Sequence, residues 1–421
     1  MKYIGSSRQP TALYYIALTE ICRRIAFGAI AYLFFFYIAD FQYFTEHASG
    51  QIGTVFLSIT IFLPILGGFI VERIHYRLSV IWGILLNAIG CFLILTSSLP
   101  FLFIALVLVA FGNALFQPGS YALLGTFYQQ KPHLRDSGFS IYYALISLGQ
   151  LSAFWILNSL ADLKNLQAAF AITGSIGLIG LIPLSIALKQ YNRLKLQAAE
   201  NAFSPLHKQE KDRIWVAVIL TLFSIVFWIA QDLSHTTLSP LWIEYGPSMI
   251  RLLPFDMQLF SIQSLYLISI ALVLAKIYLF SYKKRSYSNA ILKISLAFFI
   301  LSICFAMFTL DSFELNFGSY VTSSVFTVYF FVVLAELLLA PIGLSLITRL
   351  SPRRYTAVLI GIWITCFNAA FYLRDLAFLF IPSPVSPHML FETVAIALII
   401  IGLLVFALSK KLNRMCHFEL F

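Results

Sequence analysis

The stretch TALYYIALTEICRRIAFGAIAYLFFFYI, residues 11–38, is apolar over most of its length yet carries Glu20, Arg23 and Arg24. It is long enough to cross the hydrocarbon core of a bilayer, about 30 Å thick, as one helix. A charge inside such a helix costs about 2.5–3.5 kcal/mol on insertion scales. Spacings of three and four residues place the three charges on one helix face. We therefore interpret them as part of a transport pathway.

Composition indicates a membrane protein over the whole chain. Of the 421 residues, 60% are hydrophobic and only 11% are charged, and a soluble fold cannot bury so much apolar surface. Apolar runs of about 20 residues recur, as spanning helices require, whereas the strands of a membrane barrel are only ~10 residues long and alternate strictly. We predict an all-α polytopic membrane protein with about twelve spans, at residues 11–38, 51–71, 78–97, 101–127, 138–160, 168–188, 214–233, 259–280, 291–310, 321–347, 357–380 and 391–408.

Lysine and arginine are distributed unequally between the two sides of the predicted membrane. One set of connections is rich in both, whereas the opposite set holds only Lys164 and Arg251. Because basic residues are retained in the cytoplasm, we expect both termini there, which requires an even number of spans. The net charge of +10 therefore reflects topology. Since the basic residues are scattered over short segments, we expect no nucleic-acid partner.

The longest strongly polar interruption is residues 189–213, which separates halves of similar span number. We predict an amino-terminal six-helix bundle at 1–188, a cytoplasmic linker at 189–213 and a carboxyl-terminal six-helix bundle at 214–421. The cysteines show no paired or metal-type spacing. Since no nucleophile–base set, metal cluster or phosphate-binding glycine loop is recognisable, we expect neither an enzyme nor a cofactor.

The segment GGFIVERIHYR, residues 67–77, follows the second predicted span and resembles a loop signature of the major facilitator superfamily. Glu72 stands where aspartate is commoner. The resemblance implies two bundles that rock about a central substrate site, with Glu72 and Arg73 in a cytoplasmic gate latch. The alternative is a charged loop that sets topology and happens to follow two glycines.

Longer segments are similar to the proton-dependent oligopeptide transporter family of that superfamily. They are GNALFQPGSYALLGTFYQQKPHLRDSGFSIYYALISLGQ at 112–150, FWIAQD at 227–232, IQSL at 262–265 and ELLLAPIGLSLITRLSPRRYTAVLIGIW at 336–363. The segment EICRRIAF at 20–27 aligns with the ExxERF motif of the family's first helix. These matches lie in both halves in the family's order. They imply proton-driven uptake of di- and tripeptides by alternating access.

A short peptide is a zwitterion, so its site needs a cation for the carboxylate and an anion for the ammonium group. Arg24 and Glu336 match the family positions for these two roles. Trp363 lies in the same similar segment as Glu336 and is a further candidate for substrate binding. The alternative for Glu336 is a helix-packing acid satisfied by a neighbouring hydroxyl.

Several candidate substrate-binding positions depart from the family pattern. A lysine usual in the fourth helix is Gln117, and asparagines of the fifth and eighth helices are Ser147 and Tyr266. The second acid of the first-helix motif is Arg23, which adds one positive charge where Gln117 removes one. These changes support an alternative function, a diverged carrier of the same fold that takes another small zwitterion or anion or works without protons.

Arg23 leads to a specific hypothesis about coupling. We hypothesise that it replaces the missing lysine as the partner of Glu20 or of the substrate carboxylate. Glu20 would then take up a proton when substrate occupies its arginine partner. The alternative is that Arg23 only neutralises Glu20.

Two further charged pairs lie in the carboxyl-terminal half. Asp232 and His235 are one helical turn apart, so they can share a hydrogen bond and couple protonation to gating; alternatively, both are simply hydrated near the outer mouth. Arg374 and Asp375 are adjacent in sequence. We expect them to point in different directions and to need different partners, in a structural or gating role.

Taken together, the residues and the resemblance predict a proton-coupled di- and tripeptide transporter of the cell membrane, or of the inner membrane if the source is bacterial. The expected partners are small peptides, protons and the lipid bilayer. The proton gradient is the expected energy source, and we expect no metal and no obligatory protein partner.

Overall fold

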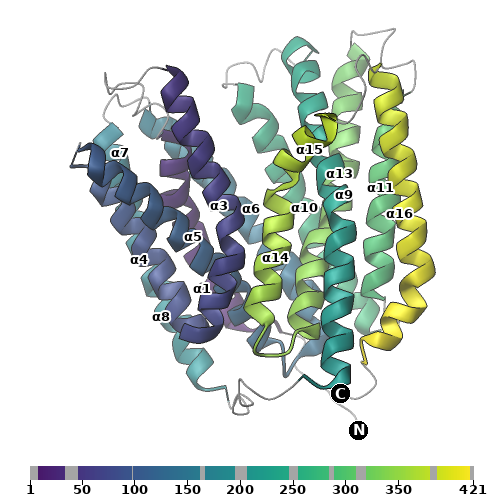
Figure 1. The fold of residues 1–421 in the computed structure, drawn as a ribbon, viewed down its shortest axis with the longest axis horizontal. Helices are drawn as coiled ribbons and strands as arrows, with labels where there is room; N and C mark the ends of the chain where they lie inside the picture. The colour runs from purple at the N-terminus through teal and green to yellow at the C-terminus, as the bar shows by residue number, and fades with distance from the viewer. Residues whose placement is uncertain are drawn as a thin grey trace. The chain divides into compact units, whose positions relative to one another are not determined.

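The structure is a computed structural model that describes residues 8–33, 46–96, 98–161, 166–194, 206–245, 255–283, 289–309, 319–379 and 386–417 (Figure 1). Every regular element in these ranges is a helix. The first elements are α1 (Thr11–Gly28), η1 (Ala29–Leu33), α3 (Glu46–Ile74), α4 (Tyr76–Ile94), α5 (Leu99–Phe127), η2 (Pro132–Leu134), α6 (Arg135–Ala161), α7 (Leu166–Ile179) and α8 (Leu181–Asn192). They are followed by α9 (Lys208–Tyr245), α10 (Phe255–Lys283), α11 (Ala290–Thr309), α13 (Ser319–Leu350), α14 (Thr356–Asn368), α15 (Ala370–Leu379) and α16 (Pro387–Met415).

Within the described ranges, 10 helical segments are long and apolar enough to cross a membrane. Each coincides with one of the predicted spans, so the all-α, multi-span prediction is confirmed. The first predicted span is occupied by α1 and the π-helical turn η1 up to Leu33, and its residues 34–38 lie outside the described ranges. The total of twelve spans and the cytoplasmic position of both termini stay predictions.

Two predicted spans are not continuous helices. The span predicted at 357–380 is interrupted, because α14 ends at Asn368 and α15 begins at Ala370. Asparagine has a low helix propensity, which agrees with a helix end at Asn368. The span predicted at 168–188 is interrupted at Gly180, whose carbonyl oxygen accepts a hydrogen bond from the Thr19 hydroxyl at 3.2 Å.

The chain divides into two compact units. Unit 1 comprises Met1–Gly138, Ala144–Ser204 and Pro352–Thr365. Unit 2 comprises Phe139–Tyr143, Pro205–Ser351 and Cys366–Phe421. The predicted division into two six-helix bundles at 189–213 stays a prediction, since residues 195–205 lie outside the described ranges.

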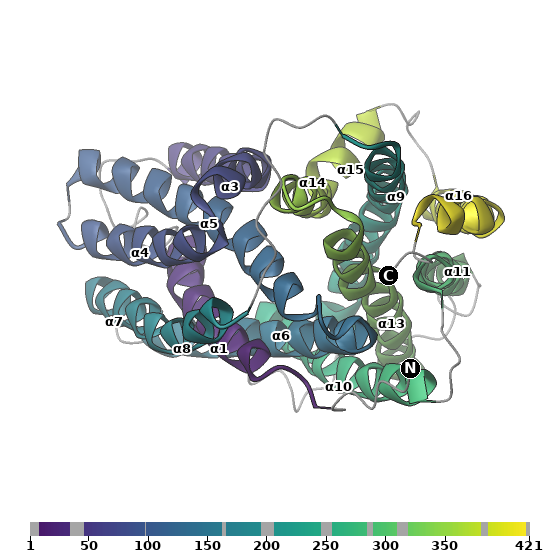
Figure 2. The ribbon, with the colours of Figure 1, turned by 90° about the horizontal axis from the view of Figure 1, so that it is seen from below.

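In unit 1, α4 lies between α5 and α7 (Figure 2). The backbones of α4 and α5 approach closely at Gly83, where an added Cβ would lie 2.7 Å from the Cβ of Phe116 and 2.9 Å from the carbonyl oxygen of Gly112. In lipid, van der Waals packing between close backbones drives helix association, and small residues permit it. Gly83 is therefore a packing residue of this crossing.

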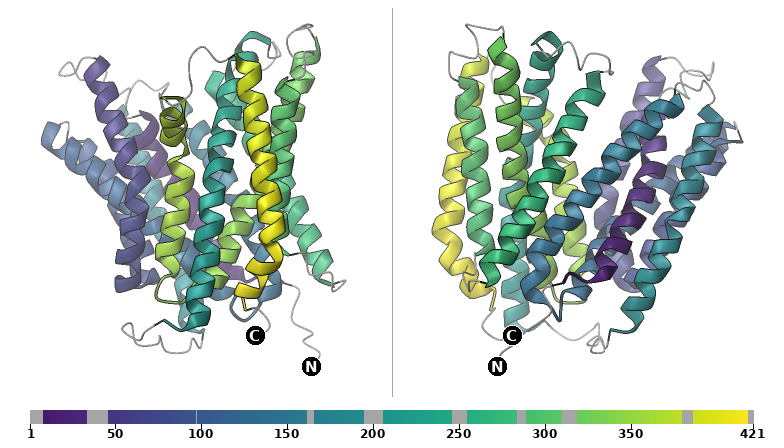
Figure 3. Two further views of the ribbon diagram at one scale, coloured as in Figure 1. Left: turned by 45° about the vertical axis from the view of Figure 1, so that its right-hand side comes forward. Right: turned by 180° about the vertical axis from the view of Figure 1, so that it is seen from behind.

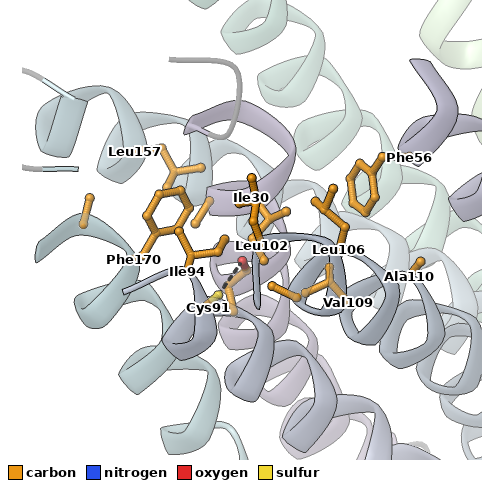
Figure 4. Close-up of a cluster of buried hydrophobic side chains, with 14 of the residues drawn as sticks. Ile30, Phe56, Cys91, Ile94, Leu102, Leu106, Val109, Ala110, Leu157 and Phe170 are labelled. Carbon is orange, nitrogen blue, oxygen red and sulfur yellow. Dashed lines mark hydrogen bonds between the residues drawn. The ribbon is translucent and has the colours of Figure 1, made fainter. Parts of the chain in front are cut away.

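Buried side chains of α1, η1, α3, α4, α5, α6 and α7 form an apolar cluster in unit 1 (Figure 4). It includes Ile30, Cys91, Val109 and Phe170. The Cys91 thiol donates to the carbonyl oxygen of Ala26 at 3.4 Å, so this cysteine behaves as a small core residue. The cluster anchors η1, which continues directly from the charged helix α1.

In unit 2, α11 packs against both α13 and α16 (Figure 3). The Ser295 hydroxyl of α11 donates to the carbonyl oxygen of Gly402 in α16 at 2.9 Å. Helix α13 also packs against α9 and α10. The middle of α13 is accordingly buried, and Glu336 is only 4% exposed.

We predict that Gly83→Val destabilises the protein, because the added side chain forces α4 and α5 apart. The free energy of unfolding should fall by about 1–3 kcal/mol, the usual cost of overpacking. The midpoint of thermal unfolding in detergent measures this change. Ile89→Val on α4 is the control, since Ile89 is 42% exposed, and an equal midpoint for both variants would contradict the close crossing.

Candidate functional site

Glu20, Arg23 and Arg24 form one ionic cluster on α1. The Nε and Nη2 atoms of Arg23 donate to the two carboxylate oxygens of Glu20, each at 2.7 Å. The Nε atom of Arg24 donates to Glu20 at 2.9 Å. The carboxylate therefore accepts three charge-assisted hydrogen bonds from two guanidinium groups, and the cluster keeps a net charge of +1.

Arg23 is directed entirely into the interior of unit 1. It is 2% exposed, and its Nη1 atom donates to the side-chain oxygen of Asn113 on α5 at 2.7 Å. Its guanidinium carbon lies 4.9 Å from the ring centre of Phe116. Gln117 donates to the same oxygen of Asn113 at 3.0 Å. Arg23 is thus the partner of Glu20, one of the two roles proposed for it, and Asn113 is a contact that the sequence did not indicate.

Arg24 is the more accessible cation of the cluster. Its side chain is 25% exposed, and its Nη1 atom makes only a long contact, 3.4 Å, with the side-chain oxygen of Gln150 on α6. Ser147, one turn before Gln150, is 2% exposed. Within this cluster, Arg24 is therefore the basic group that retains donor capacity for a ligand.

Glu336 of α13 is the buried acid of unit 2. One of its oxygens accepts a hydrogen bond from the Tyr143 hydroxyl at 2.5 Å, and the other accepts one from Nε2 of Gln231 on α9 at 2.6 Å. Gln263 is a further hydrogen-bond partner of this carboxylate. All three donors are neutral, and within the described ranges no cation pairs with Glu336. Neither Tyr143 nor Gln231 was predicted from sequence, although Gln231 lies in the similar segment 227–232.

The predicted hydrogen bond between Asp232 and His235 is wrong. Asp232 instead accepts from Nη1 of Arg374 at 2.5 Å, whereas the imidazole of His235 contacts Gln263 at 3.4 Å and the ring of Tyr329 at 5.8 Å between centroids. The arginine, an ion with five donors, is the stronger partner for the carboxylate.

The expectation that Arg374 and Asp375 need different partners is also wrong. The Nε and Nη2 atoms of Arg374 donate to one oxygen of Asp375 at 3.1 and 2.8 Å. A guanidinium group is a planar fork, so the same side chain can serve Asp232 and Asp375 together. This triad joins α15 to α9 within unit 2.

The remaining candidates lie in apolar surroundings. The ring of Tyr266 on α10 stands edge-on to Phe330 with centroids 6.2 Å apart, and Trp363 on α14 in unit 1 is 2% exposed. These contacts indicate packing and do not test a substrate contact.

Glu72 lies at the amino-terminal end of α14 within unit 1. Its carboxylate accepts a hydrogen bond from the backbone N–H of Ala357 at 2.5 Å. The Tyr76 hydroxyl donates to the carbonyl oxygen of Arg353 at 3.0 Å, whereas Arg73 is exposed. A carboxylate at a helix amino terminus is stabilised by the free N–H groups and the helix dipole, so Glu72 ties α3 to α14.

Comparison with known families identifies the class of protein. Residues 16–373 match the Major Facilitator Superfamily. The chain belongs to this superfamily, whose members are membrane transporters and not enzymes. Its multi-pass membrane location follows from the same match and from the apolar helices.

Curated relatives extend over nearly the whole chain. The uncharacterized transporter YclF of Bacillus subtilis (strain 168) is 23% identical over 486 aligned positions, covering 97% of this chain and 96% of the relative. Dipeptide and tripeptide permease B of Edwardsiella piscicida is 24% identical and covers 98% of this chain and 97% of the permease. The resemblance to peptide transporters is therefore confirmed.

Solved structures show the same fold. The peptide transporter POT in complex with sulfate has a TM-score of 0.65 and 20% identity, covering 99% of this chain and 97% of that chain. A POT family transporter in complex with 5-aminolevulinic acid has a TM-score of 0.66 and 19% identity, with 98% of each chain covered.

We predict that Glu20→Leu is strongly destabilising, because it leaves the guanidinium of Arg23 buried without a counter-ion. Breaking a buried ion pair costs about 3–5 kcal/mol of unfolding free energy. The double variant Glu20→Leu/Arg23→Leu should recover much of this loss, because it removes the uncompensated charge as well. Thermal unfolding in detergent gives the three values.

Glu392→Leu is the control for this cycle, since the side chain of Glu392 is 59% exposed and its contact with His388 is 3.9 Å long. It should change the free energy of unfolding by no more than about 0.5 kcal/mol. A double variant no more stable than Glu20→Leu would contradict the assigned ion pair.

Proposed function

We propose that this chain is a proton-coupled transporter that takes up di- and tripeptides by alternating access. The observation that carries the proposal is that each unit contains one charged group of opposite sign with unused hydrogen-bonding capacity. Unit 1 presents the accessible cation Arg24, and unit 2 holds the acid Glu336 without a cationic partner. A zwitterion such as a short peptide offers each group its complement.

Arg24 is suited to a substrate carboxylate. The cluster of Glu20, Arg23 and Arg24 has an excess positive charge, and Arg23 is fully occupied by Glu20 and Asn113. An incoming carboxylate would therefore meet Arg24 and displace only its long contact with Gln150. In a low-dielectric site this attraction exceeds its value in water.

Glu336 is suited to a substrate ammonium group. Its hydrogen bonds come from the neutral side chains of Tyr143, Gln231 and Gln263 and do not use all of the roughly four acceptor positions of a carboxylate. A buried carboxylate without a counter-ion is costly, so an arriving cation gains both electrostatic energy and hydrogen bonds. In this proposal Tyr266 and Trp363 contribute apolar contacts to the substrate, and Glu72, Arg73, Arg374 and Asp375 act in gating.

Proton coupling is assigned to α9 in this proposal. The three hydrogen bonds from guanidinium groups to Glu20 favour its charged form, so Glu20 is the less suitable proton carrier. Asp232 shares its single arginine with Asp375, and His235 makes only a weak polar contact. These two residues are the proposed carriers, and the proton gradient of the cell membrane, the inner membrane in a bacterium, supplies the energy.

A second candidate function rests on the same observation, namely that the Glu20 carboxylate accepts three hydrogen bonds from guanidinium groups. If no group on α9 exchanges a proton during transport, the chain is a facilitator of peptides or of another small zwitterion or anion. The two candidates differ in their response to a proton gradient. They also differ in competition, since dipeptides but not free amino acids should compete if peptides are the substrate.

The test is uptake of a labelled dipeptide into proteoliposomes with and without an inward proton gradient. We expect the gradient to stimulate uptake and Glu336→Gln to reduce uptake at least tenfold, because the amide cannot pair ionically with an ammonium group. Glu392→Gln is the matched control, since it makes the same chemical change at an exposed site. Uptake indifferent to the gradient would establish the facilitator, and no uptake by folded wild-type protein would refute peptide transport.

A further inference from the structure

Asn113 of α5 binds the guanidinium group of Arg23 at the end that does not face Glu20. Asn113 is 1% exposed, and its side-chain oxygen accepts hydrogen bonds from Nη1 of Arg23 at 2.7 Å and from Nε2 of Gln117 at 3.0 Å. Because both donors meet the same atom, the amide of Asn113 must present its oxygen to them and turn its nitrogen away. Gln117 therefore fixes the orientation in which Asn113 accepts from Arg23.

Two arginines of α1 bind one carboxylate, and they do so unequally. Arg23 binds both oxygens of Glu20, through Nε and Nη2, whereas Arg24 donates only once, to Oε1. Both arginines lie about one helical turn from Glu20, so the helix alone does not determine which of them takes the bidentate position. A contact outside α1 must determine it.

The interior of unit 1 supplies this contact to Arg23. A guanidinium group is a rigid planar fork, so the hydrogen bond from Nη1 to Asn113 also fixes the direction in which Nε and Nη2 face Glu20. The rings of Phe27 and Phe116 lie with their centres 5.7 and 4.9 Å from the guanidinium carbon of Arg23 and hold the same group. These surroundings favour Arg23 in the bidentate position.

We infer that Asn113 is a positioning residue for the proposed transport site, because it holds Arg23 on both oxygens of Glu20. Arg24 then keeps its remaining donors for the substrate carboxylate. If the acceptor of Asn113 is removed, Arg23 loses a buried partner, and Arg24 can take the bidentate position on Glu20 in its place. The inference rests on the proposed function and deepens it, since a neutral residue of α5 then controls the accessible cation of α1.

The experiment compares wild-type protein with Asn113→Leu, a change of similar shape that removes the acceptor. The two compounds are alanyl-alanine and alanyl-alaninamide, in which a neutral carboxamide replaces the carboxylate. We expect the KM for alanyl-alanine uptake into proteoliposomes to rise about tenfold with an unchanged maximal rate, since a hydrogen bond between charged groups is weakened. The constant for inhibition of this uptake by alanyl-alaninamide should be the same in both proteins.

Asn87→Leu is the matched control, because it makes the same change at another buried site of unit 1. Asn87 lies on α4, is 1% exposed, and donates to the carbonyl oxygen of Gly83 at 2.7 Å. This variant should leave both constants unchanged.

Asn113→Ala gives a second reading if Asn113→Leu folds poorly, because alanine is smaller and has the highest helix propensity. It should show the same selective loss of alanyl-alanine. Unchanged KM values in both variants would overturn the inference. Equal weakening of both compounds would overturn it too, since that result indicates a structural role without an effect on the carboxylate.

A stability measurement separates this inference from the proposed function, because it decides the inference even if wild-type protein imports no dipeptide. In the wild-type background, Arg24→Gln should lower the midpoint of thermal unfolding in detergent only slightly, since Arg23 still neutralises Glu20. In the Asn113→Leu background, the same change should lower the midpoint by about 2 °C more, because Arg24 has become the bidentate partner. Equal effects in the two backgrounds would overturn the inference.

Discussion

A charge inside a helix bundle that excludes water must be paired, and this constraint governs the polar interior of both units. In unit 1, Glu20 accepts hydrogen bonds from two arginines. One of them, Arg23, also contacts Asn113 and Phe116 on α5. In unit 2, Arg374 joins Asp232 to Asp375. The pairing fixes side-chain positions as well as lowering the cost of burial, because a guanidinium fork engages its partners in defined directions.

In the part of the chain that the structure describes, Glu72 and Glu336 are held by hydrogen bonds and not by ion pairs. The Glu72 carboxylate accepts a hydrogen bond from the backbone at the start of α14, where the helix dipole takes the place of a cation. The Glu336 carboxylate accepts hydrogen bonds from the neutral side chains of Tyr143 and Gln231. Glu72 therefore caps the start of α14, whereas Glu336 is the buried acid to which the proposed function assigns a cationic group of the substrate.

Close backbone packing makes this arrangement of charges possible. Gly83 lets α4 approach α5, the helix that supplies Asn113 and Gln117. The Thr19 hydroxyl of α1, one residue before Glu20, donates to the carbonyl oxygen of Gly180, which also accepts the backbone N–H of Leu184. The buried cluster around Ile30 then holds the end of the same segment. The charged face of α1 is thus positioned by close helix packing and by the Thr19 hydrogen bond in addition to its own ion pairs.

The sequence by itself determined the class of fold, because the length and apolarity of each span are local properties that the bilayer thickness fixes. It also placed Glu20, Arg23 and Arg24 on one face, since a spacing of three or four residues is set by the helix alone. Only the tertiary structure decided that Asn113 receives Arg23, that Gln231 and Tyr143 hold Glu336, and that Arg374 turns to Asp232. Those partners are far apart in sequence, and which helix faces meet depends on packing over the whole unit, which no local periodicity encodes.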